Sequence, residues 1–349
     1  KLARSASIAS RLATSVLTPA SRLESGVSSA EHTAANNSEE ASFSWKELES
    51  MLEVWDSQFD NKEGGSNRAP KFPIPNNYQF LMRYAHLKKD DKLSEYVQLT
   101  LDKMAYGGIY DQVGGGFARY STDKLWKVPH FEKMLYDNAQ LVSLYSEAFL
   151  AYGKPLYQQT VEQTLDFIER ELSDTSGAFY SALDADSEGV EGKFYIWKIE
   201  ELKALIGEDY SLFSNYYNVN SKGFWEYGNY ILLRDKSDQE FCQKEKIDLS
   251  TLEEKVSSWN TLLLQEREKR VRPGLDDKSL TSWNALMCKG YADAYMAFGN
   301  TDYLNKAIKN ANFILNQQLQ KDGRLWHSYK NRQSTINGFL EDYAFSIEA

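Results

Sequence analysis

The sequence has few cysteines, no long apolar run and no excess of positive charge, and each absence argues against a class of protein. Only Cys242 and Cys288 are present among 349 residues, and they form no CxxC pair or Cys/His cluster, so we expect neither a disulfide framework nor a zinc site. No stretch of about eighteen apolar residues occurs, which argues against a membrane span. The formal net charge is −10 and the basic residues are scattered, which argues against a nucleic-acid surface.

The remaining composition is that of a globular protein with a large core. Hydrophobic residues make up 42% of the chain and aromatic residues 13%. Residues 1–22 are rich in Ser, Ala and Arg without an acidic residue, which resembles an organelle transit peptide, and a polar stretch follows. We therefore expect a linker or disordered segment over 1–42 and one helical domain over 43–349, in the cytoplasm or, alternatively, in mitochondria.

Apolar residues recur with helical spacing through most of the chain after residue 43. One predicted helix begins after Asp91 as its N-cap and ends at Gly107. The same pattern predicts helices over 131–149, 157–172, 283–298 and 301–315. Such a chain packs helices on helices.

Short glycine-rich and aromatic segments alternate with these helices, and we expect them to form small hairpins at one end of a repeated helical array. Periodicity alone does not separate a closed ring from an open solenoid. The segments are Gly107–Trp126, Gly177–Trp197, Gly223–Leu233 and Gly323–Tyr329.

One nearly unbroken motif carries a family resemblance. It reads GGIYDQVGGGFARYSTD from Gly107 and LWKVPHFEKMLYDNAQL from Leu125 to Leu141. The whole run resembles the family of YyaL and spermatogenesis-associated protein 20, and the resemblance extends over about Trp45 to Ala349. Four further blocks agree with it: Ala69–Pro73, Ala182–Gly189, Asp276–Asn284 and Gly338–Ala344.

The resemblance implies a mainly α fold, an (α/α)6 toroid with short β-hairpins on one rim, similar to N-acylglucosamine 2-epimerases and six-hairpin glycosidases. It also implies a thioredoxin-like domain elsewhere in the full-length protein. Because this chain shows no βαβ pattern and stops inside a predicted helix, we expect it to lack that domain and the last hairpins of the ring.

Two histidines are candidate proton-transfer groups. His130 lies seven residues before Asp137, which would place both on one stripe of a helix if His130 were in its first turn. An imidazole oriented by a carboxylate transfers protons near neutral pH. His327 lies in a predicted rim hairpin and is a candidate for a second such group. The alternative for either histidine is a hydrogen-bonded cap or core residue.

Asp184 and Asp186 are a candidate pair of catalytic carboxylates. They are two residues apart in a predicted extended loop, and paired carboxylates can divide into an acid and a base, as glycoside hydrolysis requires. A solvated turn or a calcium-binding turn explains the same residues equally well.

The remaining candidates are carboxylates, cations and aromatic rings that would hold a sugar. Aromatic residues at helical spacing are more often core, however, and the glycines of the motif fit either a ligand-lining loop or tight turns. The predicted substrate-binding set is Asp111, Arg119, Tyr120, Trp126, Glu132, Lys133, Asp277, Trp283, Glu341 and Asp342.

Together these features predict a carbohydrate- or polyol-binding enzyme-like domain that works by His/carboxylate acid–base catalysis, as an epimerase, isomerase or glycosidase. The alternative is a non-catalytic scaffold that binds clients for a thioredoxin-like redox protein. We expect no metal, no cofactor, no nucleic acid and no membrane partner.

Overall fold

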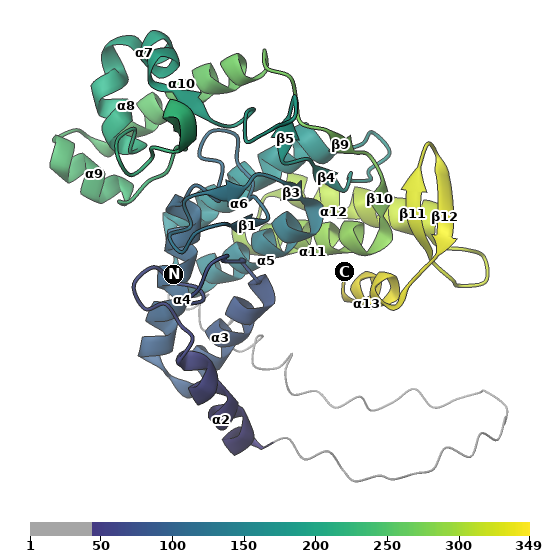
Figure 1. Ribbon diagram of the computed structural model, residues 1–349. Helices are drawn as coiled ribbons and strands as arrows, with labels where there is room; N and C mark the ends of the chain where they lie inside the picture. Colours follow the sequence, from purple (N-terminus) through teal and green to yellow (C-terminus); the bar gives the residue numbers. More distant parts are fainter. Residues whose placement is uncertain (1–43) are drawn as a thin grey trace. The chain divides into compact units, whose positions relative to one another are not determined.

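The computed structural model describes residues 44–349 (Figure 1). The predicted linker over 1–42 lies outside these residues. The chain divides into two units, Lys1–Ser57 and Gln58–Ala349. In the first unit the described part is helix α2, Trp45–Asp56, which begins after Ser44; the side chain of this N-cap accepts a hydrogen bond from Glu47 N.

The second unit is mainly helical. None of the helices within residues 44–349 combines the length and the hydropathy needed to cross a bilayer. Its α-helices are α3 (Pro75–Lys88), α4 (Asp91–Tyr106), α5 (Leu135–Tyr152), α6 (Pro155–Phe167), α7 (Ile199–Ile206), α8 (Tyr210–Tyr216), α9 (Asp238–Glu245), α10 (Leu249–Arg267), α11 (Thr281–Phe298), α12 (Thr301–Phe313) and α13 (Leu340–Glu348).

Short antiparallel strands connect the helices. They form the pairs β1-β2, β5-β6 and β7-β8 and the three-stranded sheets β3-β4-β9 and β10-β11-β12. The predicted fold class, helical with small hairpins, is confirmed. The strands are β1 (Tyr120–Ser121), β2 (Pro129–His130), β3 (Lys133–Met134), β4 (Ala182–Leu183), β5 (Asp186–Ser187), β6 (Val190–Glu191), β7 (Trp197–Lys198), β8 (Asn229–Tyr230), β9 (Leu275–Asp276), β10 (Ser279–Leu280), β11 (Trp326–Lys330) and β12 (Gln333–Asn337).

The helices pack in two layers. In the first layer α5 lies between α3 and α11, and α11 packs on α13 (Figure 1). In the second layer α4 packs on α3, α6 on α5, and α12 on α11. This alternation of layers along the chain is the arrangement of an α/α toroid. Because α5 and α11 have neighbours on several sides, they bury residues around most of their circumference.

The repeat predicted from the sequence is visible in the hydrogen bonds at the starts of α5 and α11. Asn138, in α5, accepts a hydrogen bond from Phe117 N and donates to Phe117 O and Met134 O. Asn284, at the same position of α11, makes the equivalent bonds with Phe179 and Leu280. Each asparagine therefore fastens a preceding loop to the start of a first-layer helix.

Between β7 and β9 the chain forms a helical insertion, α7 to α10. The sequence analysis did not predict these four helices. The insertion has an apolar core, which includes Phe213, Trp259 and Leu263, and Val113 of the motif loop belongs to the same cluster. Figure 1 shows these four helices grouped together. Its last helix, α10, brings a charged residue to the loop of the family motif, as described below.

Several helix boundaries differ from the sequence prediction by a few residues, and the starts of α4 and α5 are two of them. The N-cap of α4 is Asp90, not Asp91, and its side chain accepts from Leu93 N. Helix α5 begins at Leu135 instead of Phe131, because Lys133 and Met134 pair with β4 of a distant hairpin. Helical periodicity depends on neighbouring residues in the chain, so it does not reveal such a long-range strand pairing.

Candidate functional site

Three first-layer helices begin side by side. The rings of Tyr136 in α5 and Trp283 in α11 lie 4.8 Å apart. Ser282 N, also in α11, donates to Asp342 Oδ1 of α13 at 2.9 Å. Several predicted residues therefore meet at one end of the helical layers. We call this group the helix-start site; it comprises Arg119, His130, Glu132, Tyr136, Asp137, Trp283, His327 and Asp342.

Asp137 is the most strongly perturbed carboxyl of the helix-start site. It lies in the first turn of α5, and although the residue is partly exposed, its Oδ2 atom is buried and has no hydrogen-bond partner among residues 44–349. Burial raises the pKa of Asp137 to about 7, while the charge of Arg119 opposes the rise and that of Glu132 adds to it. Near neutral pH this carboxyl can therefore either give or take a proton.

Arg119 and Glu132 form an ion pair next to Asp137. The Nη1 atom of Arg119 lies 3.0 Å from Oε2 of Glu132, and Arg119 N donates to Glu132 O at 2.8 Å. The hydrogen bond to Glu132 is the main reason why the pKa of Arg119 is raised. The guanidinium remains partly exposed, so it can also meet a ligand.

His130 is oriented by different carboxylates from the one predicted. Its Nδ1 lies 2.8 Å from Oε1 of Glu191, and its Nε2 lies 3.7 Å from Oε2 of Glu132. The ring stacks on Tyr120 with centroids 4.9 Å apart. The predicted His130–Asp137 stripe is wrong, because His130 belongs to strand β2 and not to the first turn of α5.

His327 and Asp342 form a second imidazole–carboxylate pair. His327 Nδ1 lies 2.9 Å from Oδ2 of Asp342, which is fully buried and also accepts from Phe339 N at 2.8 Å. The carboxylate engages Nδ1, and Nε2 of His327 makes no hydrogen bond in the part of the chain that the structure describes. This arrangement suits proton transfer at Nε2.

The other predicted carboxylates are not drawn into the helix-start site. Asp184 is exposed beyond the end of β4, and Asp186 pairs in register with Glu191 in the β5-β6 hairpin. Asp277 forms an ion pair with Lys330 at 2.5 Å. Glu341 is an exposed neighbour of Asp342. Within the described residues, no hydrogen bond or ion pair joins the two predicted catalytic aspartates to Asp137.

Trp126 provides no ring face for a ligand. Its side chain is completely buried, and its Nε1 donates to Glu63 O at 3.0 Å. The predicted role of Trp126 in substrate binding therefore disagrees with its buried position. This position agrees with the alternative that Trp126 is a core residue. Trp283, by contrast, is partly exposed at the start of α11.

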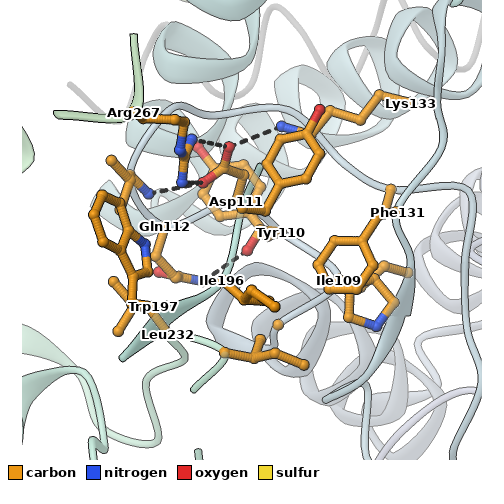
Figure 2. Close-up of a pocket in the computed structure, with 16 residues that line it drawn as sticks. Ile109, Tyr110, Asp111, Gln112, Phe131, Lys133, Ile196, Trp197, Leu232 and Arg267 are labelled. Carbon is orange, nitrogen blue, oxygen red and sulfur yellow. Dashed lines mark hydrogen bonds and ion pairs between the residues drawn. The ribbon is translucent and has the colours of Figure 1, made fainter. Parts of the chain in front are cut away.

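Asp111 and Lys133 belong to a buried ion cluster instead of an open binding surface (Figure 2). Asp111 Oδ2 lies 2.9 Å from Lys133 Nζ and 2.7 Å from Arg267 Nη1 of α10. Burial lowers the pKa of Lys133 to about 8, whereas the two cations hold that of Asp111 far below its usual range. The cluster fastens the insertion to the motif loop.

The glycines of the motif are explained by close packing. Gly115 and Gly116 have positive φ angles of 74° and 79°. A Cβ atom at Gly115 would overlap the carbonyl oxygen of Gln163, and one at Gly116 would overlap the ring of Phe167, both in α6. Tight turns against α6 therefore account for these two glycines.

Sequence reasoning missed Glu191 and Arg267. Glu191 is 61 residues from His130, and Arg267 is 156 residues from Asp111. Neither lies in a motif that pointed to chemistry, so no local signal could have found them. Among residues 44–349, no group of three or more His, Cys, Asp or Glu side chains is placed to hold a metal ion.

Comparison with known proteins identifies relatives of this chain. It is 36% identical to human spermatogenesis-associated protein 20 over 330 residues, which cover 84% of this chain and 42% of the relative, and equally identical to the mouse protein. An uncharacterised Caenorhabditis elegans protein is 33% identical, with 45% of its length covered. The chain thus spans less than half the length of these curated relatives. No family model matches it.

Solved structures resemble the chain only distantly. Cellobiose 2-epimerase from Spirochaeta thermophila is 15% identical, with 87% of this chain and 94% of that one covered and a TM-score of 0.36. Unsaturated glucuronyl hydrolase from Bacillus sp. GL1 is 13% identical, with 78% and 52% covered and a TM-score of 0.44. Over 84% of its length, this chain is a homologue of the spermatogenesis-associated protein 20 proteins, as its motifs predicted.

Proposed function

We propose that the helix-start site binds a neutral carbohydrate or polyol and transfers protons on it. The observation that carries this proposal is Asp137, a carboxyl with one buried, unpartnered oxygen and a pKa of about 7. A perturbed carboxyl among other polar groups is a physical sign of a functional site, because burial without a partner costs stability.

The surroundings of Asp137 suit a sugar. Tyr136 and Trp283 offer partly exposed rings for the C–H faces of a sugar, and Arg119 and Glu132 offer a donor and an acceptor for hydroxyl groups. The site carries carboxylates of its own, which disfavours a polyanionic ligand.

Two proton-transfer groups are available for the chemistry. Asp137 in its protonated form can donate to an oxygen of the ligand, and Nε2 of His327 can accept a proton from the ligand or from water. For epimerisation the proton would leave a carbon beside a carbonyl group and return on the other face. For hydrolysis the acid would protonate the leaving oxygen while a base activates water. The site residues do not choose between these reactions.

A non-catalytic scaffold is the second candidate function, in which the helical domain would bind clients of a thioredoxin-like domain in the full-length protein. The observation that favours it is that Asp111, Lys133 and Asp277, three of the predicted ligand contacts, are already satisfied by partners within the chain. Under this proposal the motif residues maintain the loop structure.

Ligand-induced thermal stabilisation tests the two candidates. The wild-type chain, Asp137→Asn and the matched control Asp302→Asn, in the exposed first turn of α12, would be screened with monosaccharides, disaccharides and sugar phosphates. A ligand at 100 times its Kd stabilises the native state by about 2.7 kcal/mol. We expect one neutral sugar to raise the Tm of the wild type and the control but not of Asp137→Asn. If no sugar shifts the Tm of the folded wild type, the scaffold function is favoured.

A further inference from the structure

A small cavity lies beside the buried ion cluster, between the motif loop and the helical insertion. Its volume is about 30 Å³, and its walls include Tyr195. They also include Asp111, Lys133, Trp197 and Arg267, which are labelled in Figure 2. Trp197 and Arg267 are 1% and 4% exposed. The cavity is far too small for a sugar, but it exceeds the roughly 10–15 Å³ that a single water molecule needs.

Three residues in the walls of this cavity each carry a buried hydrogen-bonding atom without a partner. These atoms are Nε of Arg267, the hydroxyl of Tyr195 and Nε1 of Trp197, and none is bonded to another group in residues 44–349. Arginine and tryptophan nitrogens can only donate. Burial and the nearby Asp111 carboxylate raise the pKa of Tyr195, so its hydroxyl also keeps its proton to donate. Buried donors without acceptors are rare in native proteins and call for an occupant.

The charge balance around the cavity is positive. Lys133 and Arg267 share one carboxylate, that of Asp111, which leaves one cation in excess among these buried groups. Arg170 lies nearby, but it is exposed and pairs with Glu171. The guanidinium of Arg267 lies 5.3 Å from the ring of Tyr195 and 5.9 Å from that of Trp197. Because Arg267 is only 4% exposed, bulk water screens its charge little. An uncompensated buried charge is costly.

We propose that a small monovalent anion, chloride under ordinary conditions, occupies this cavity. It would accept hydrogen bonds from Arg267, Tyr195 and Trp197 and balance the excess charge of Lys133 and Arg267. A water molecule fits the volume but would bring two protons of its own, and it would leave the charge unbalanced. This proposal is independent of the helix-start site, because it concerns a different set of residues.

The anion would act as a structural link. Trp197 belongs to β7 at the start of the insertion, Arg267 to the last turn of α10, and Lys133 to β3, which leads directly into α5. An ion that is bonded to Trp197 and Arg267 and attracted by the charge of Lys133 would hold the insertion against the helical layers. Its removal would therefore loosen the insertion more than the first-layer helices.

Bromide replacement tests the proposal directly. Crystals of the protein grown in sodium bromide, with gluconate as the anion of the control crystals, would be measured at the bromine absorption edge. We expect an anomalous peak inside the cavity, beside Arg267 and Trp197. A cavity that holds only water in saturating bromide would overturn the proposal.

Thermal unfolding distinguishes a native ion from an adventitious one. At constant ionic strength, about 0.15 M chloride should raise the Tm by roughly 3 °C relative to gluconate, since an ion that binds the native state alone stabilises it. Trp197→Phe should lose most of this difference, whereas Trp259→Phe, whose indole nitrogen already bonds to Asp209, should keep it. Equal Tm values for the wild type in the two salts would identify an adventitious ion only and would also overturn the proposal.

Discussion

Asp342 Oδ1 accepts a hydrogen bond from the backbone nitrogen of Ser282 at 2.9 Å, so one buried carboxylate joins the first turn of α13 to the first turn of α11. The same carboxylate bonds to Phe339 N and His327 Nδ1. A single side chain thus caps its own helix, positions the neighbouring helix and orients a histidine.

Replacement of Asp342 by alanine should destabilise the protein strongly. The change leaves the buried backbone donor of Ser282 and the partly buried backbone donor of Phe339 without an acceptor, and we expect a loss of about 2–3 kcal/mol in the free energy of unfolding. Urea denaturation followed by circular dichroism measures it. The matched control is Glu341→Ala in the same turn, which is exposed and should change stability by less than about 0.5 kcal/mol. Equal losses in both variants would contradict the assigned role of Asp342.

The stability contribution of Asp137 should depend on pH. Its pKa is about 7 in the folded protein, against an ordinary value of 3.8, so the folded state binds the proton more tightly than the unfolded state. This contribution is complete below about pH 4 and is lost as the pH rises towards 7. Relative to the wild type, Asp137→Asn should therefore gain about 2–3 kcal/mol between roughly pH 5 and pH 8. Urea titrations at a series of pH values measure this difference, and a pH-independent difference would refute the raised pKa.

Removal of the charge of Arg119 should raise the pKa of Asp137 further. The guanidinium lowers that pKa, and its loss also frees Glu132, whose negative charge raises it. In Arg119→Met the pH window of the Asp137 contribution should move above pH 7, as measured by the same comparison with and without Asp137→Asn. Arg83→Met, which breaks the pair with Glu147, is the control and should leave the window in place. A shift to lower pH would contradict this prediction.

Replacement of Asp111 by asparagine should destabilise the protein more than most substitutions that remove one charged side chain. It would leave Lys133 and Arg267 buried together without their shared counter-ion, which costs about 3–5 kcal/mol. Asp235→Asn removes a carboxylate with two exposed lysine partners and should cost less than about 1 kcal/mol. The free energies of unfolding of the two variants would be measured at the same chloride concentration and compared. Similar small losses would show that the buried cluster contributes little.

The sequence by itself determined five of the helices, the hairpin segments and the family relationship. Helical periodicity is a local property of neighbouring residues, so α4, α5, α6, α11 and α12 could be predicted with small errors at their ends. The motif from Gly107 to Leu141 also contained many residues of the helix-start site, including Arg119, Glu132 and Asp137. Residue types alone pointed to acid–base chemistry there.

The tertiary structure alone decided which side chains meet. His130 pairs with Glu191 across 61 residues of sequence, Asp342 with Ser282 across 60, and Arg267 with Asp111 across 156. Such partners depend on how distant elements pack, and no local spacing encodes them. Burial is decided in the same way: it removed Trp126 from the surface and raised the pKa of Asp137, because desolvation follows from the surrounding fold and not from the neighbouring residues in the chain.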